Sequence, residues 1–291
     1  MRLITYQTPK GPGLGVLSAD IAAEQFVPVP GISMLELIAQ GEAGLERARQ
    51  ALASGTLRPL AGLPLLAPIP QPPRNIFCLG WNYAEHSKEA AAMRGKPAKL
   101  PDRPIFFTKL TTAVNSHEGR IEVDPRVSEQ LDWEVELGLV IGKGGKNIPR
   151  DRALEHLFGY TIINDVSARD VQVGHGGQFF KGKSLDGTCP MGPWIVTPDE
   201  LPDPHHLRLR TSVNGVLKQD GNTADLIFDI PAILEWLSLG LTLLPGDIIA
   251  TGTPAGVGFA RTPPEFLHPG DVVECEVEGI GLLRSHIVSG A

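Results

Sequence analysis

The chain has little of several features that direct proteins to other functions. Its three cysteines, Cys78, Cys189 and Cys275, are far apart and form no CxxC pair, which argues against a zinc cluster or a redox motif. A low, odd cysteine count is typical of a reducing compartment. No stretch is rich in Lys or Arg and the formal net charge is −7, so we expect no nucleic-acid partner.

Long apolar runs are also missing. No segment reaches the ~20 apolar residues needed to cross a bilayer, and the N-terminal stretch MRLITYQTPKGPG lacks the apolar run of a signal peptide. We therefore expect no membrane partner and a cytoplasmic location. Of the 291 residues, 42% are hydrophobic and 20% are charged, which is ordinary for a globular protein.

The sequence patterns predict a mainly β protein with some α structure (α+β class), built as a sandwich, barrel or roll. Short apolar or alternating runs recur at close spacing, and Asn214-Gly215 between two of them is a strong hairpin signal. Helices and strands do not alternate, which disfavours a doubly wound sheet. The proline-rich stretch 63–74 predicts a linker. We expect a small N-terminal α+β module at 1–70, with one helix over 34–54, and a larger domain at 71–291.

Two glutamates fall on one face of a strand predicted in the segment LDWEVELGLVI (131–141). Because strand side chains alternate between faces, Glu134 and Glu136 lie opposite Trp133 and Val135. Adjacent carboxylates repel each other and resist burial unless a cation binds them or the face is wet. Asp165, at the end of GYTIIND, is the best third ligand. Such a set suits Mg²⁺ or Mn²⁺, which favour oxygen ligands and keep positions open for substrate.

Structural interpretations of these residues stay open at this point. Glu134 and Glu136 also fit the solvated face of an antiparallel strand, and Asp165 fits a helix cap. A further alternative is a non-catalytic β-rich protein that uses the carboxylates for structural Ca²⁺. That alternative predicts tightly held metal without open coordination positions.

Four motifs, in this order and spacing, resemble the fumarylacetoacetate hydrolase family: LDWEVELGLVIG, GYTIINDVSARDVQ, GKSLDGTCPMGPW and GDIIATGTPAGVG. The resemblance covers roughly residues 70–288, and the first 70 residues resemble the small N-terminal module of many members. It implies a mixed β-sandwich roll that forms a homodimer. The chain departs from the family pattern at Trp81, where many relatives have Arg or Leu, and in the LDG after Lys183-Ser184.

The resemblance also implies roles for individual residues. These are metal binding by Glu134, Glu136 and Asp165, substrate binding by Arg169, Gln172 and Thr253, and catalysis by Lys183, His86 and Glu89. The three-residue spacing of His86 and Glu89 places both on one helix face, where the carboxylate can orient the imidazole as a base. Spacing alone also fits a polar helix surface, and Lys183 alone also fits a solvated loop.

A 2-oxo acid can chelate one ion through a carboxylate oxygen and a keto or enolate oxygen, and the ion stabilises the enolate charge. The leading interpretation is a divalent-metal-dependent hydrolase that cleaves a C–C bond in acylpyruvate-type β-diketo acids through a metal-bound pyruvate enolate. The same site suits an oxaloacetate decarboxylase or tautomerase, or an isomerase/decarboxylase of unsaturated 2-oxo dicarboxylic acids. The sequence favours water chemistry through His86 and leaves these alternatives open.

Overall fold

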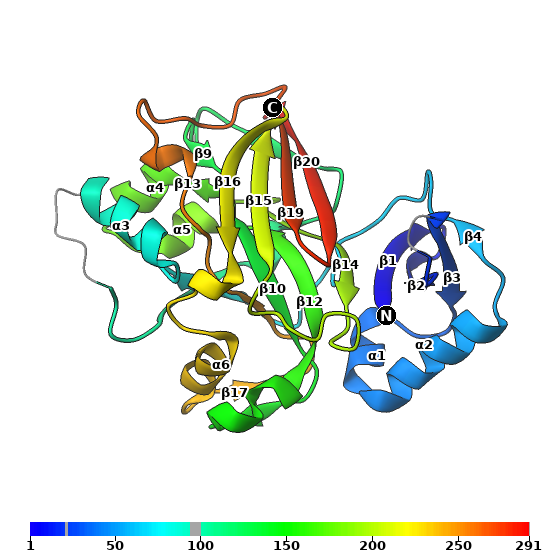
Figure 1. Cartoon of the computed structure of the whole chain (residues 1–291). Helices are drawn as coiled ribbons and strands as arrows, with labels where there is room; N and C mark the ends of the chain where they lie inside the picture. Colours follow the sequence, from blue (N-terminus) through cyan, green and yellow to red (C-terminus); the bar gives the residue numbers. More distant parts are fainter. Residues whose placement is uncertain (21–22, 94–99, 291) are drawn as a thin grey trace.

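The chain folds around two β-sheets in the computed structural model, which describes residues 1–20, 23–93 and 100–290 (Figure 1). Within these residues the larger sheet contains, in spatial order, β4 (Arg58–Pro59), β3 (Gln25–Val29), β2 (Gly11–Leu17), β1 (Arg2–Thr8), β14 (Cys189–Val196), β12 (Leu157–Asn164), β10 (Val135–Ile141), β18 (Ile248–Ala250), β5 (Ile76–Gly80) and β6 (Ile105–Lys109), with β7 (Val114–Asn115) paired to β14. The smaller sheet contains β16 (Val216–Asn222), β15 (Arg208–Val213), β19 (Val272–Val277), β20 (Gly281–Ser289) and β8 (Gly119–Val123).

Helices and short strand pairs complete the fold. The helices are α1 (Met34–Ala39), α2 (Glu42–Ser54), α3 (Ala84–Met93), α4 (Arg169–Gly174), α5 (Phe179–Lys183) and α6 (Ile230–Ser238), with 3-10 turns η2 (Thr111–Ala113), η3 (Arg150–His156), η4 (Thr223–Asp225) and η5 (Gly258–Ala260). The short pairs are β9 (Leu131–Asp132) with β13 (Ser167–Ala168), and β11 (Gly145–Lys146) with β17 (Thr242–Leu243). The predicted α+β class and sandwich-like roll are confirmed.

Strand β10 is buried on both faces because it lies between two cores. Leu137 and Leu139 pack in the core shared with the smaller sheet, where Leu209 and Val273 meet them. Val140 points the other way, into a second core that extends to the N-terminal strands. The strand therefore carries the alternation predicted from the sequence. The one departure is that the predicted strand is divided into β9 and β10.

The N-terminal strands continue the larger sheet. Strand β1 pairs antiparallel with β14, with Leu3 opposite Ile195, so hydrogen bonds run across the boundary that we place near residue 70. Figure 1 shows β1 to β4 with α1 and α2 to one side of the smaller sheet. The single helix expected over 34–54 is wrong, because the chain breaks between α1 and α2 at Gly41, whose φ is +55°. Ser33 does cap α1, in a capping box with Glu36.

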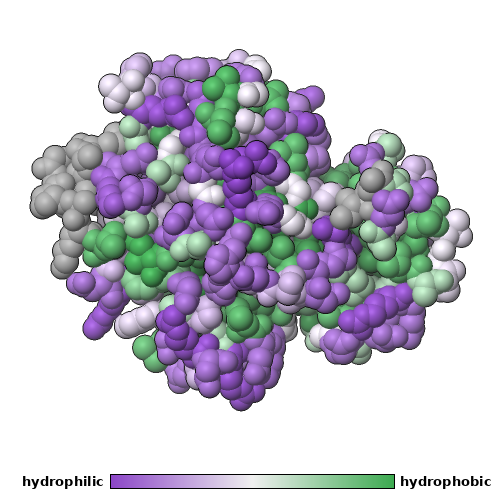
Figure 2. All heavy atoms as spheres, in the orientation of Figure 1, coloured by the Kyte–Doolittle hydropathy of each residue, from purple (hydrophilic) through white to green (hydrophobic). Residues whose placement is uncertain are grey.

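Two further sequence features are visible in the structure. Asn214 and Gly215 form the two-residue turn between β15 and β16, and both have positive φ, as this hairpin turn requires. Among the described residues, no helix is long and apolar enough to span a membrane. Figure 2 shows hydrophilic and hydrophobic residues interspersed over the visible face.

Candidate active site and metal centre

Three carboxylates converge where two neighbouring strands meet. Strands β10 and β12 are antiparallel, with Val135 opposite Asn164, so Glu134 before β10 and Asp165 after β12 lie at the same end of the pair. The Asp165 N–H donates to the Glu134 carbonyl at 2.9 Å, which extends the ladder by one step. Glu136 joins them from within β10. One carboxylate oxygen from each residue lies within 4.8 Å of the others.

Burial decides between the interpretations that the sequence left open. The exposed fractions are 4% for Glu134, 1% for Glu136 and 0% for Asp165, so these residues do not form a solvated strand face. Asp165 does not cap the following helix either, because the N-cap of α4 is Ala168. Burying three carboxylates at one point is costly unless positive charge compensates them.

Two lysines supply part of that charge. Lys183, at the end of α5, places Nζ 2.7 Å from Oε2 of Glu134 and 2.9 Å from Oδ2 of Asp165. Lys109, at the end of β6, donates to the other oxygen of Asp165 at 2.8 Å. Both lysines are buried.

Arg169 compensates Glu134 and one further carboxylate, that of Asp132. Its Nη2 lies 2.7 Å from both Oε1 of Glu134 and Oδ2 of Asp132, and its Nη1 donates to the side-chain oxygen of Gln172 at 3.2 Å. Asp132 also accepts backbone N–H bonds from Gly258 and Phe259. Arg169 is thus held rigidly, with Gln172 beside it at the pocket.

The charges at this centre are not balanced. Burial alone would raise the pKa of Glu134, but the charges of Lys183 and Arg169 outweigh it and lower the pKa to about 2. For Glu136, burial and then the charges of Asp165 and Glu134 raise the pKa well above its usual value. The Gly252 N–H donates to Oε2 of Glu136 at 2.6 Å, and this hydrogen bond offsets only part of the rise in the pKa.

The donor set therefore fits a divalent cation. Glu134, Glu136 and Asp165 offer hard oxygen ligands of the kind that Mg²⁺ and Mn²⁺ prefer, and Ca²⁺ takes the same ligand type. Among the described residues, four buried carboxylates face the three permanently charged side chains Lys109, Lys183 and Arg169, together with the buried imidazole of His86. A bound divalent ion would leave the centre with a net positive charge, which suits an anionic ligand.

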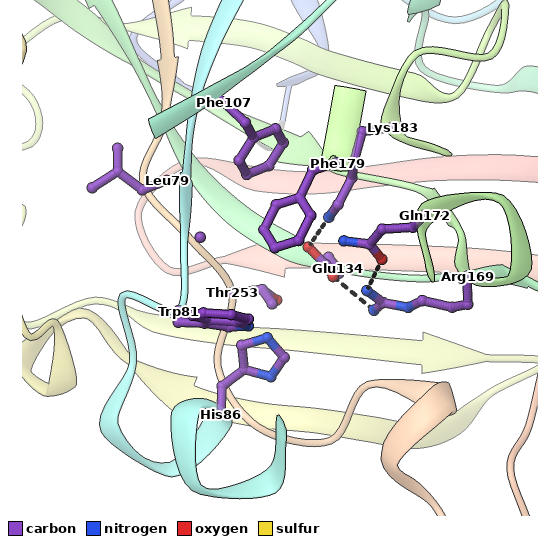
Figure 3. Close-up of a pocket in the computed structure, with 11 residues that line it drawn as sticks. Leu79, Trp81, His86, Phe107, Glu134, Arg169, Gln172, Phe179, Lys183 and Thr253 are labelled. Carbon is purple, nitrogen blue, oxygen red and sulfur yellow. Dashed lines mark hydrogen bonds and ion pairs between the residues drawn. The ribbon is translucent and has the colours of Figure 1, made fainter. Parts of the chain in front are cut away.

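A small cavity, about 30 Å³, lies beside this centre (Figure 3). Its polar lining consists of Glu134, Arg169, Gln172, Lys183, Thr253 and His86, and its apolar lining includes Leu79, Trp81, Phe107 and Phe179. The structure thus gathers most of the predicted site residues around one pocket. Glu136 and Asp165 lie behind Glu134, and His175, in an exposed loop, is not part of the lining.

His86 and Glu89 face each other on α3, as their spacing predicts. His86 lines the pocket and is 8% exposed, and its Nδ1 lies 3.6 Å from Oε2 of Glu89. Glu89 in turn accepts the Gly256 N–H at 3.1 Å. At 3.6 Å the two groups form no hydrogen bond, and Nδ1 has no hydrogen-bond partner among the described residues, so Glu89 faces the imidazole without fixing it, while the ring lines the pocket (Figure 3).

Thr253 lines the pocket, but its hydroxyl is engaged by the protein. It donates to the Val135 carbonyl at 2.8 Å and accepts from Nε2 of Gln219 at 2.8 Å. Gln219 also accepts the Val135 N–H, so it fixes the start of β10 and the Thr253 loop together. In this arrangement the Thr253 hydroxyl has no proton left to donate, so Thr253 shapes the pocket.

Sequence reasoning missed three residues of this centre: Lys109, Asp132 and Gln219. Lys109 gave a weak signal as the one basic residue in the apolar run IFFTKL. Asp132 shares the strand face of Glu134 and Glu136 in the sequence pattern, but nothing there showed that it pairs with Arg169. Gln219 gave no signal, because its partners are far away in the chain.

Fold and site together define the class of protein: an α+β enzyme with a buried acidic triad that can hold a metal beside a small pocket. The chain belongs to the fumarylacetoacetate hydrolase family, because residues 75–288 match the fumarylacetoacetate (FAA) hydrolase C-terminal family. It is 45% identical over 269 residues to the oxaloacetate tautomerase YisK of Bacillus subtilis (strain 168), a match covering 89% of this chain and 87% of the relative.

Solved structures agree with this assignment. The fumarylacetoacetate hydrolase of Exiguobacterium antarcticum superposes with a TM-score of 0.85 at 39% identity, and the match covers all of both chains. The maleylpyruvate hydrolase of Sphingobium sp. SYK-6, solved with manganese(II) and pyruvate, has a TM-score of 0.81 at 29% identity, again over the whole of both chains. Family membership therefore covers proteins named for different reactions.

Proposed function

We propose that the protein is a divalent-metal-dependent oxaloacetate tautomerase, which interconverts the keto and enol forms of this four-carbon 2-oxo acid. The observation that carries the proposal is the small, largely buried pocket, which combines cationic side chains with His86 as a proton carrier. The similarity to an oxaloacetate tautomerase over most of both chains supports the same reaction. This similarity supports the tautomerase, which the sequence left open as an alternative to the C–C hydrolase.

The metal in this proposal is Mg²⁺ or Mn²⁺, held by Glu134, Glu136 and Asp165. The manganese in a structural relative supports the choice of a hard divalent ion. When bound, the ion supplies stabilisation of the negative charge that develops on the substrate's C2 oxygen.

Lys183 and Arg169 bind and orient the substrate anion. Lys183 is fully charged, because the pKa that burial alone would lower is raised above its usual value by Asp165 and Glu134. Its ammonium group faces the pocket and attracts the carboxylate of the 2-oxo acid end. Arg169 keeps Glu134 and Gln172 in place, so that the polar side of the pocket is fixed before the substrate enters.

His86 moves the proton. In this proposal Nδ1 lies on the Glu89 side, 3.6 Å from its carboxylate, and Nε2 is the nitrogen that meets the substrate. The imidazole takes a proton from C3, the electron pair of the broken C–H bond forms the C2–C3 double bond, and the C=O pair moves onto the C2 oxygen. Return of the proton to that oxygen gives the enol, and the reverse sequence gives the ketone, so no other reactant is consumed.

The second candidate is the metal-dependent hydrolysis of acylpyruvates. The His86–Glu89 pair favours it, because an oriented imidazole can equally remove a proton from water, and a maleylpyruvate hydrolase is among the structural relatives. It requires a pocket that accepts a longer acyl arm. Decarboxylation of oxaloacetate and isomerisation of unsaturated 2-oxo dicarboxylic acids use the same groups.

One assay with Mg²⁺ or Mn²⁺ separates these reactions. The ultraviolet absorbance of freshly dissolved enol-oxaloacetate should decay faster with enzyme than without it, and pyruvate should form no faster than in the same metal solution without enzyme. Pyruvate release from oxaloacetate above this metal-only rate would instead indicate a decarboxylase. Pyruvate release from acetylpyruvate or fumarylpyruvate, without faster enol decay, would indicate the hydrolase. An unchanged rate with every substrate would favour the non-catalytic metal-binding alternative.

For the assembly and its location, we propose a cytoplasmic homodimer, as the family resemblance implies. The three cysteines are free and buried, which supports a reducing compartment. Light scattering coupled to size-exclusion chromatography measures the mass of the assembly directly, and a monomer mass near 31.2 kDa would contradict the dimer.

A further inference from the structure

Trp81 has an unusual backbone conformation at the wall of the pocket. It directly follows β5 and has a φ of +54°, in the left-handed region. Residues with bulky side chains rarely adopt this region of backbone conformation, which glycine adopts readily. Such a conformation persists only where its surroundings fix it, and it occurs mainly at functional sites.

The next residue, Asn82, fixes this conformation. Its side-chain amide donates to the Thr251 carbonyl at 2.9 Å and to the Phe228 carbonyl at 3.1 Å, and its side-chain oxygen accepts the Phe228 N–H at 2.8 Å. Its backbone carbonyl accepts the Ile227 N–H at 2.8 Å. The backbone at Trp81 is therefore held between β5 and the segment before α6.

Phe179 packs against the indole from the other side, and Phe107 packs against Phe179. The rings of Trp81 and Phe179 are 5.8 Å apart in an edge-to-face contact, and those of Phe179 and Phe107 are 5.5 Å apart. Gly80 permits this packing, because a Cβ there would lie 3.2 Å from the Phe179 ring. We call these three rings the aromatic wall. In Figure 3 they lie across the pocket from the side chain of Arg169.

The pocket combines charged groups with the aromatic wall, and this arrangement favours one orientation of a 2-oxo acid. Its charged 2-oxo acid end is attracted by the acidic triad with its ion and by Lys183, whose Nζ lies 5.3 Å from the centroid of the Phe107 ring, whereas Trp81 offers it no charge. In this orientation the rest of the substrate extends toward Trp81. Since the free space beside these rings is small, about 30 Å³, an arm that extends in this direction meets the indole of Trp81 as it grows longer.

We propose that Trp81 is a specificity-determining residue that limits the substrate to short 2-oxo acids, of the size of a four-carbon acid, and excludes longer acyl arms. The proposal rests on the proposed function in one respect, because it takes the 2-oxo acid end to bind at the acidic triad. Trp81 suits this role because its backbone is fixed and Phe179 supports its ring, so the indole does not yield easily to a larger ligand.

A ladder of ligands with increasing length tests the proposal. The Mn²⁺-loaded protein is titrated with pyruvate, 2-oxobutanoate, 2-oxopentanoate and 2-oxohexanoate, which lack a β-keto bond that can be cleaved, and the dissociation constants are measured by calorimetry. Trp81→Gly removes the indole and keeps the backbone, since glycine adopts positive φ without strain. The ratio of the dissociation constants for 2-oxohexanoate and pyruvate should fall at least about tenfold, because one methylene in a tight pocket changes selectivity by about 10- to 200-fold.

Two controls make the result specific. Trp81→Phe keeps a ring that can meet Phe179 and should give an intermediate ratio. Trp236→Ala removes a partly exposed tryptophan that packs on Arg103 in the α6 region, and it should leave the ratio as in the unmodified protein. An unchanged ratio in Trp81→Gly would overturn the proposal, and so would a failure of both proteins to bind any of these acids.

The binding ladder is independent of the reaction assay. If the ratio falls in Trp81→Gly but enol-oxaloacetate decays no faster with the enzyme, the tautomerase is wrong and the size limit stands. If the enol decays faster but the ratio is unchanged, the tautomerase stands and Trp81 does not set the limit.

Discussion

Lys109 and Asp165 form an ion pair in which neither side chain has any exposed surface, with Nζ 2.8 Å from Oδ1. Lys109 also donates to the Val166 carbonyl at 3.0 Å. The other oxygen of Asp165 accepts a hydrogen bond from Lys183. Lys183 lines the pocket, whereas Lys109 does not. Asp165 is therefore held from behind by one lysine and approached from the pocket by another.

Lys109→Met should destabilise the metal-free protein by about 3–5 kcal/mol, because it leaves a buried carboxylate without one of its partners. Mn²⁺ should restore part of this loss, since the ion supplies positive charge at the same carboxylate. Denaturant unfolding with and without Mn²⁺ measures both effects. Lys88→Met, which breaks only the exposed pair with Glu85, is the control. If Mn²⁺ stabilises the unmodified protein, Lys109→Met and Lys88→Met equally, the role given to Lys109 is contradicted.

Glu136→Gln should abolish detectable Mn²⁺ binding without lowering the stability of the metal-free protein. The reason is that the charged form of Glu136 is disfavoured by burial and by Asp165 and Glu134, while the amide has nearly the same shape. A Mn²⁺ titration followed by electron paramagnetic resonance and a thermal melt give the two values. Unchanged Mn²⁺ affinity would remove Glu136 from the ligand set.

His86→Ala should slow the decay of enol-oxaloacetate by about 10²- to 10⁴-fold, the usual contribution of a positioned acid or base. Binding of oxalate, which mimics the enolate, should change little, because His86 moves a proton and does not hold the anion. His175→Ala, in the exposed loop after α4, should alter neither value. Equal losses of rate and oxalate affinity in His86→Ala would show that His86 binds the ligand instead.

The parts of the site that were predictable share a local cause. Alternation along a strand places Glu134 and Glu136 on one face whatever the rest of the fold does, and the three-residue spacing places His86 beside Glu89. The contact between Lys109 and Asp165 has no such local cause. It joins residues 56 positions apart and depends on the pairing of β5 with β6.

The fold shows the same division. The Asn214-Gly215 hairpin was predictable because both turn residues must adopt positive φ, which these residue types tolerate. The break between α1 and α2 was not, because the apolar pattern continues through Gly41. A tertiary approach accompanies the break: a Cβ on Gly44 would lie 2.2 Å from the Leu37 carbonyl oxygen, so the two helices meet closely there.

The pH dependence of stability should include a contribution from His117. Burial lowers its pKa below the usual 6.5, although Glu118 opposes this, and Arg284 and His286 add to it. A lowered folded-state pKa means that the unfolded chain binds the proton more readily, so stability is present above pH 6.5 and falls as the pH drops below that value. In His117→Asn, whose amide oxygen can still accept the Arg284 N–H, melting temperatures should fall less steeply from pH 7 to 5. Identical slopes would contradict this.

The charge of Lys183 should weaken the binding of the metal ion, although both cations strengthen the binding of the substrate anion. The ammonium group lies 2.7 Å from one oxygen of Glu134 and 2.9 Å from one of Asp165, so its charge occupies the ligands that a cation needs. Lys183→Met should therefore tighten Mn²⁺ binding, because like charges this close repel each other strongly in a buried site. The same change should weaken oxalate binding to the Mn²⁺-loaded protein, because the anion loses its cationic partner.

The opposite signs of these two effects make this prediction specific. A lysine with a purely structural role would, when removed, weaken both ligands or leave both unchanged. Calorimetric titrations with Mn²⁺, and then with oxalate on the loaded protein, give the two constants. Lys181→Met is the matched control, since Lys181 lies on the same short helix and is exposed. If Lys183→Met and Lys181→Met behave alike, Lys183 is not the group that contacts both the acidic triad and the substrate anion.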